Sequence, residues 1–158
     1  MDAATRAELV AQYRDGVAEV ESAVAAALAL GPDAIDRCPA PDEWSPRQVV
    51  HHLADSETMS ATRIRRLVAD DEPVLIQGYD EPVWAGRLHY DRPIEGSLTL
   101  LRAVREATAD LLERMTEADW ARTGTHSESG PYSAERWLEI YAAHAHDHAD
   151  QIRRAAGS

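Results

Sequence analysis

The chain has 158 residues, 44% hydrophobic and 28% charged, which is the composition of one globular domain rather than of a disordered segment. Acidic residues outnumber basic ones by 28 to 16, and the formal net charge of −12 argues against a nucleic-acid partner and against polybasic attachment to a membrane. No apolar run approaches the roughly 20 residues that span a bilayer, and the first residues lack a secretion-signal pattern. We therefore expect a single cytoplasmic domain over residues 1–158, in which the one cysteine, Cys38, is structural.

Two helices are predicted in the first half of the chain from apolar residues at three- and four-residue spacing. The first carries an apolar stripe from Leu9 to Leu28 and ends at Gly31-Pro32. The second begins at Ser45, which caps the helix, and Pro46 occupies the first helical position. Gln48, three residues after the cap, completes a capping box.

Two more helices are predicted in the second half. The third follows Gly96-Ser97, and its apolar stripe reaches Met115. The fourth follows Gly130-Pro131-Tyr132-Ser133 and carries apolar residues from Trp137 to Ala155. No stretch shows the alternating pattern of a β-strand, so we expect an all-α fold.

The lengths of the connections predict the topology. About 14 residues join the first helix to the second, and a similar number joins the third to the fourth, so each pair can be antiparallel. Residues 70–95, between the second and third helices, are long enough to travel the length of a bundle. We therefore predict an up-down-down-up four-helix bundle with one long crossover, and a plain up-and-down bundle is the alternative.

Two of the seven histidines fall in the middle of the apolar stripe of the fourth helix. At about 100° per residue, His144 and His148 lie about 20° to either side of Trp137, whereas His146 lies near 180°, on the outer face. Imidazoles four residues apart on one helix can reach a single metal ion. The alternative is a pair of neutral histidines satisfied by core hydrogen bonds, although two adjacent unpaired rings are costly to bury.

A third metal ligand is expected from the second helix, which carries His51-His52. His52 lies on the flank of the apolar stripe and is the better candidate, whereas His51 points nearly away from the stripe, toward solvent. His89 and His126 fall in predicted loops, and nothing in their spacing relates them to the other histidines.

The set of His52, His144 and His148 is rich in nitrogen and holds no cysteine, which suits one divalent transition metal, with zinc or nickel the preferred ions. Three protein ligands leave a tetrahedral metal one open position, which is the arrangement of catalytic rather than structural sites. A water bound there becomes a nucleophile near neutral pH, and a substrate thiol binds as the thiolate.

Several motifs together resemble the YfiT-like branch of the DinB-like superfamily. They are Trp44-Ser45-Pro46-Arg47-Gln48-Val49-Val50-His51-His52-Leu53-Ala54-Asp55-Ser56, Tyr79-Asp80-Glu81 with Trp84, Gly96-Ser97-Leu98 with Leu100-Leu101, and His144-Ala145-His146-Asp147-His148-Ala149. The similarity runs from about residue 40 to the end, and the first helix fits only by pattern. The chain departs from this branch at Gln151, where another histidine is common, and in its shorter N-terminus.

The resemblance implies a crossover four-helix bundle and a metal triad of His52, His144 and His148, in agreement with the helical wheel. It also implies a homodimer. The alanine-rich helices favour the same state, because such helices often leave an apolar flank that a second subunit can cover. Members of the family are classed as metal-dependent hydrolases or as thiol S-transferases that use a low-molecular-weight thiol cosubstrate such as bacillithiol. We therefore expect a metalloenzyme for a small-molecule substrate, and the alternative is a non-catalytic, stress-associated bundle that binds a metal or a small ligand.

Four further residues are candidates for roles at the site. Glu57, on the apolar stripe of the second helix, is a candidate acid/base or hydrogen-bond partner of an imidazole, or else the ion-pair partner of an arginine on a neighbouring helix. Gln151, one turn after the last histidine of the triad, either orients a water or substrate or satisfies a core polar contact. Tyr79 and Trp84, in the crossover, are candidates for the pocket mouth.

Overall fold

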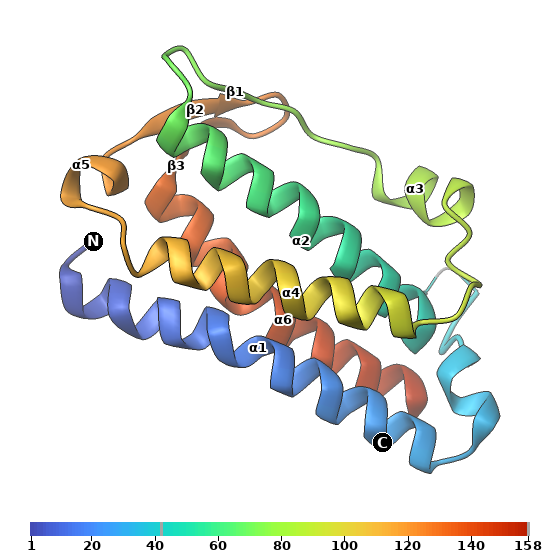
Figure 1. Cartoon of the computed structure of the whole chain (residues 1–158). Coiled ribbons are helices and arrows are strands. Elements are labelled where there is room, and N and C mark those ends of the chain that lie inside the picture. Colours follow the sequence, from blue (N-terminus) through green and yellow to red (C-terminus); the bar gives the residue numbers. More distant parts are fainter. Residues whose placement is uncertain (42, 158) are drawn as a thin grey trace.

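The computed structural model describes residues 1–41 and 43–157 and consists of four long helices with a small sheet at one end (Figure 1). The long helices are α1 (Ala3–Ala29), α2 (Pro46–Ala69), α4 (Glu95–Leu112) and α6 (Ala134–Ala156). The shorter helices are η1 (Pro32–Asp36), α3 (Glu81–Arg87) and α5 (Glu117–Trp120). The strands are β1 (Leu75–Ile76), β2 (Thr123–His126) and β3 (Gly130–Ser133).

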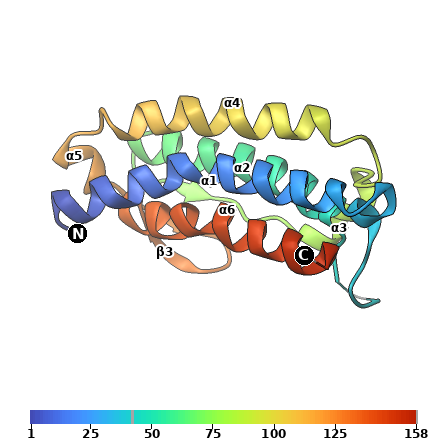
Figure 2. The same ribbon diagram turned by 90° about the horizontal axis from the view of Figure 1, so that it is seen from below.

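The long helices follow the predicted up-down-down-up course. Helix α1 packs along α6, and α2 packs along both α4 and α6, while α1 and α2 lie diagonally across the bundle (Figure 2). Helices α2 and α4 start at the same end, where His51 of α2 lies 2.8 Å from the hydroxyl of Ser97 of α4. They therefore run parallel, the crossover is confirmed, and the plain up-and-down alternative is wrong.

The predicted start of α2 is confirmed at its cap. The Ser45 hydroxyl accepts a hydrogen bond from the Gln48 backbone N–H at 3.3 Å, and Gln48 Oε1 accepts one from the Ser45 N–H at 3.0 Å. Pro46 occupies the first helical position, where its missing N–H costs nothing. This capping box fixes where α2 begins and hence which of its residues face the bundle.

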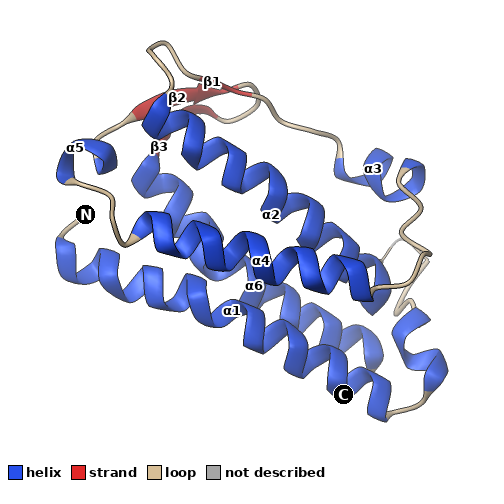
Figure 3. Cartoon of the chain, viewed as in Figure 1, coloured by secondary structure: helices blue, strands red, loops and turns tan. Residues whose placement is uncertain are grey.

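The structure corrects two details of the sequence prediction. Helix α4 begins at Glu95, so it contains Gly96-Ser97, and it ends at Leu112, before Met115. A three-stranded sheet is present, in which β2 pairs in parallel with β1 and antiparallel with β3 (Figure 3). With only two, four and four residues, the strands are too short for their alternation to stand out in the sequence.

The sheet anchors the crossover beside the bundle. The backbone N–H of Ser127 donates to the Ile76 carbonyl at 2.9 Å, and the Ser127 hydroxyl accepts from the Gly78 N–H at 2.9 Å. These bonds hold the chain directly before Tyr79, whose ring then lies over a cavity between α2 and α6. The sheet thus places the Tyr79 side chain of the crossover beside α2 and α6.

A buried arginine joins all four long helices. Arg105 of α4 donates from Nη1 to Glu57 Oε2 of α2 at 2.9 Å, and from Nε to the Tyr13 carbonyl of α1 at 3.0 Å. Its Nη2 donates to the Tyr141 carbonyl of α6 at 3.1 Å, and the Tyr13 hydroxyl donates to Glu57. The ion pair is fully buried, with side-chain exposures of 1% and 0%.

Hydrophobic residues pack on both sides of this polar network. One cluster includes Leu67 and Trp137 and lies toward the sheet, and the other includes Leu53 and Ile152 and lies toward the opposite end. At Gly16 of α1 a Cβ atom would lie only 2.8 Å from the Cβ of Ala145 of α6, so glycine permits the close approach of these helices. Among the described residues, no helix has the length and apolar character that a membrane span requires.

We expect Arg105→Met to lower the free energy of unfolding by about 3–5 kcal/mol, because the variant leaves the Glu57 carboxylate buried without its cation. The free energy of unfolding of the double variant Glu57→Met/Arg105→Met should fall by less than that of the single variant, since no charge then remains unpaired. Urea unfolding followed by circular dichroism measures both losses. Arg102→Met, on the exposed side of the same helix, is the control and should change stability little, so an equal loss there would contradict this role of Arg105.

Candidate metal centre

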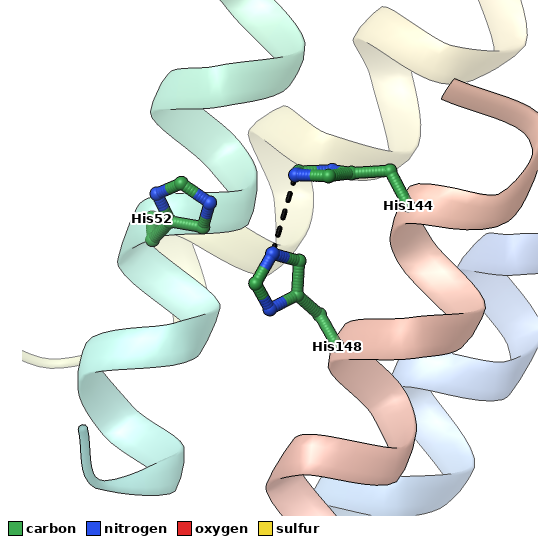
Figure 4. Close-up of side chains that lie close together, drawn as sticks. All are labelled: His52, His144 and His148. Atoms are coloured by element: carbon green, nitrogen blue, oxygen red, sulfur yellow. Dashed lines mark hydrogen bonds between the residues drawn. The ribbon is translucent and has the colours of Figure 1, made fainter. Parts of the chain in front are cut away.

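The three predicted histidine ligands come together between α2 and α6 (Figure 4). His52 projects from α2, and His144 and His148 project from successive turns of α6. One ring nitrogen of each residue lies within 4.8 Å of the other two. Histidines that are almost a hundred residues apart in the sequence therefore form one cluster.

The two rings on α6 present their Nε2 atoms to each other at a distance of 3.2 Å. His148 donates from Nδ1 to Gln151 Oε1 at 2.6 Å, which places its proton on Nδ1 and leaves the Nε2 lone pair facing the cluster. Gln151 therefore orients a candidate ligand. Of the two alternatives for this residue, the structure shows the polar contact within the bundle.

Burial keeps the three rings neutral. It lowers the pKa of His144 to about 2 and that of His52 to about 3, and repulsion between the protonated forms of neighbouring rings adds to both shifts. Burial also lowers the pKa of His148, against the opposing effect of its hydrogen bond to Gln151. At neutral pH each imidazole thus keeps a free lone pair, which is the form that binds metal.

This donor set fits a divalent transition metal. Nitrogen ligands with bonds of about 2.0 Å to a tetrahedral ion lie about 3.3 Å apart, close to the 3.2 Å between the Nε2 atoms of His144 and His148. His144 Nδ1 is buried without a hydrogen-bond partner among the described residues, so the only hydrogen bond of this ring is the one between its Nε2 and that of His148. His52 is 2% exposed and packs against Trp44, with the ring centroids 4.9 Å apart.

One cavity reaches the cluster directly, and a second lies behind two residues that contact it. One of 230 Å³ is lined by His144, Ser56 and Tyr79, and Trp84 packs on Tyr79 with ring centroids 4.3 Å apart. The other, of 420 Å³, is lined by Trp44 and Gln151, which contact His52 and His148, but by none of the three histidines themselves. A cavity of 460 Å³ between α1, α4 and α5 is larger, but no histidine lines it. Small molecules can therefore approach the cluster from outside the bundle.

Two other histidines differ from the prediction. His51 is fully buried rather than solvent-facing, because its Nε2 donates to the Arg92 carbonyl at 2.9 Å and its Nδ1 accepts from the Ser97 hydroxyl. The end of the crossover and the start of α4 cover the side of α2 that a single-helix wheel leaves open. His146 is half-buried rather than on an outer face, since its Nε2 donates to the Gln12 carbonyl of α1 at 2.9 Å.

Glu57 does not contact the histidines through any hydrogen bond among the described residues. Its carboxylate accepts from Arg105, from the Tyr13 hydroxyl and from the Ser60 hydroxyl. The ion-pair alternative is thus the one that the structure shows. Glu57 positions helices, and its place on an apolar stripe reflects a buried polar network.

Several residues that line the 230 Å³ cavity were missed by sequence reasoning, among them Arg63, His126 and Glu128. Arg63 lies seven residues after Ser56, so both fall on one face of α2, and this spacing was the available signal. His126 ends β2, and only the pairing of that strand with β1 and β3 brings it to the cavity. No local pattern marks it.

Known proteins share both the sequence pattern and the fold. A sequence profile of the DinB superfamily matches residues 17–152. A protein of Oceanobacillus iheyensis named "Putative metal-dependent hydrolase" is 39% identical over 109 residues, which cover 69% of this chain and 63% of that protein. One of the same name from Geobacillus thermodenitrificans is 36% identical over 119 residues, which cover 74% of this chain and 66% of that protein.

The fold is also close to a solved structure. YfiT from Bacillus subtilis, described as "a probable metal-dependent hydrolase with an unusual four-helix bundle topology", matches with a TM-score of 0.89 and 26% sequence identity. The match covers 99% of this chain and 89% of that one. The chain spans just under two thirds of the length of the curated relatives that it matches.

We expect the stability of the metal-free protein to fall between pH 7 and pH 5, in part because of His144. The unfolded chain binds a proton at this residue near an ordinary pKa of about 6.5, whereas the folded chain does so only near pH 2, so acid favours unfolding. The loss over this range is about 2 kcal/mol for one such residue. Between pH 7 and pH 5 the free energy of unfolding of His144→Gln should therefore fall by about 2 kcal/mol less than that of the wild type, as measured by urea unfolding with a chelator present.

His89→Asn changes an exposed histidine outside the cluster and serves as the control for this pH series. It should keep the pH dependence of the wild type. If the free energy of unfolding changed equally with pH in the wild type and both variants, the burial of His144 would have no effect on the number of protons taken up on unfolding.

Proposed function

The chain belongs to the DinB superfamily, and from its histidine cluster we propose that it is a metalloenzyme that holds one divalent transition metal, zinc or nickel, at His52, His144 and His148. The observation that carries the proposal is the convergence of three neutral imidazoles beside a cavity. A divalent ion held by three imidazoles lowers the pKa of a water or thiol bound to it and polarises a carbonyl, which serves both hydrolysis and thiol transfer.

The residues around the cluster prepare it for such a role. Gln151 holds the His148 proton on Nδ1, and the ring of Trp44 covers His52. Both contacts restrict ring rotation, so little side-chain entropy remains to be lost when a ligand binds. Ser56 and Tyr79 line the cavity next to His144.

Hydrolysis is the first candidate reaction, and the names of the relatives support it. Thiol S-transfer to an electrophile is the second, and one observation favours an external thiol in that case. Cys38 is exposed, and it lies in the segment after η1 rather than in either cavity beside the histidines. A transferred thiol would therefore come from a low-molecular-weight cosubstrate.

Replacing His144 or His148 with alanine should abolish stoichiometric metal binding, since each change removes one of three nitrogen ligands. His146→Ala is the matched control, because it lies on the same helix but bonds to α1 instead of the cluster, and it should retain the metal. Metal content is measured by elemental analysis of protein purified without a polyhistidine tag. Equal metal retention in all three variants would refute the ligand assignment.

Turnover assays separate the candidate reactions. A hydrolase should convert members of an ester and amide panel with metal and water alone, whereas an S-transferase should need added thiol to convert an electrophile. In either case His52→Ala should lose activity together with the metal, and Cys38→Ser should keep it. Activity in neither assay, across several metals, would favour the non-catalytic binding bundle.

A further inference from the structure

The 230 Å³ cavity beside His144 is faced by the guanidinium group of Arg63, which forms no ion pair with a carboxylate among the described residues. Arg63 donates from Nη1 to the Tyr141 hydroxyl at 2.9 Å and from Nη2 to the Gln77 carbonyl at 3.1 Å, and both acceptors are neutral. Its Nε is buried without a hydrogen-bond partner among the described residues. The positive charge of Arg63 thus remains available to an anion in the cavity.

Two carboxylates face the same cavity. Glu81 begins α3, and Glu128 lies in the turn between β2 and β3. Gly78 leaves room for the second, because a Cβ atom there would lie 2.5 Å from the Glu128 carboxyl carbon. Burial raises the pKa of Glu81, and the charge of Glu128 adds to this effect, whereas that of Arg63 opposes it. The three charges are therefore close enough to influence one another, yet the guanidinium bonds only to neutral groups.

The same cavity is also lined by uncharged hydrogen-bond donors. The Tyr79 hydroxyl is buried without a partner among the described residues. His126 accepts at Nδ1 from the backbone N–H groups of Glu128 and Ser129, at 3.2 and 3.4 Å, so its neutral ring carries the proton on Nε2. Together with Arg63, these groups offer donors to a negatively charged or carbonyl oxygen.

We propose that this cavity is the substrate pocket and that it takes a small zwitterion, whose carboxylate pairs with Arg63 and whose ammonium group pairs with Glu81 and Glu128. The inference rests on the proposed function in one respect, since His144 at the cavity wall is taken as a metal ligand. Arg63 and the two exposed carboxylates face one cavity, so a ligand that carries both a carboxylate and an ammonium group can form charge-assisted hydrogen bonds with groups of each sign at once.

The composition of the pocket disfavours ligands with a single charge. An anion without an amine would face Glu81 and Glu128, and a cation without a carboxylate would face Arg63. At 230 Å³ the cavity is smaller than the about 300–1,000 Å³ of sites for drug-sized molecules. Free amino acids and dipeptides are the zwitterions of matching size.

The test is calorimetric titration of the metal-loaded full chain with the L-amino acids and diglycine, each compared with its N-acetyl and amide derivatives. These derivatives remove the ammonium and the carboxylate in turn. The best zwitterion should bind at least about tenfold more tightly than either of its derivatives, the effect expected for one charged hydrogen bond. If no zwitterion in the panel binds more tightly than its derivatives, the proposal is overturned.

Charge variants assign each half of the ligand. Arg63→Gln should weaken binding of the zwitterion by about tenfold and leave the amide derivative unchanged, and Arg63→Lys should restore most of the loss. Glu81→Gln/Glu128→Gln should weaken the zwitterion and leave the N-acetyl derivative unchanged. Arg66→Gln, on an exposed part of α2, is the control, and a loss there equal to that of Arg63→Gln would contradict the assignment.

Metal content and turnover, measured on the same samples, keep the two proposals apart. Selective zwitterion binding by protein that carries metal but has no activity would overturn the proposed enzyme and support the pocket. Metal-dependent turnover of neutral esters without any zwitterion preference would support the enzyme and overturn the pocket.

Discussion

The guanidinium group of Arg105 is the point on which the arrangement of the bundle depends. Its hydrogen bonds end on the Glu57 carboxylate of α2 and on backbone carbonyls of α1 and α6. Sliding α2 along α4 would leave a buried charge unpaired, and sliding α1 or α6 would leave a buried N–H donor of the guanidinium without its acceptor. Tyr141, whose carbonyl accepts one of the bonds, lies three residues before His144. The network therefore sets the height of the α6 histidines relative to His52, and a metal centre made from two helices becomes possible.

Much of the fold and the candidate cluster follows from local patterns. The capping box at Ser45 and the apolar stripes of the four long helices are properties of short segments, and they are visible without knowledge of the tertiary structure. The inward direction of His144 and His148 follows from the same periodicity, because a polar residue in the middle of an apolar stripe has to face the core.

Most features of the site that the sequence did not reveal depend on partners distant in the chain. His51 is covered by the crossover, and the ion pair that the sequence allowed for Glu57 is formed with Arg105 of α4. The cavity walls come from α2, the crossover, the β2–β3 turn and α6, so Arg63 and His126 come to line one cavity only after folding. A helical wheel shows which side of one helix is apolar, but it does not show which other segments pack against that helix. The burial and the contacts of these residues depend on those segments.

The pairing of α1 with α6 has a consequence for the order of events during synthesis. The first long helix has the last one as its main neighbour, so much of its apolar side stays uncovered until the ribosome has made α6, although η1 and α4 contact part of it earlier. Until then α2 and α4 can form a parallel pair, joined by the crossover, without completing a core. Contacts between such distant parts of a chain slow folding relative to a bundle of sequential hairpins, and nascent α1 is the segment most in need of protection from aggregation.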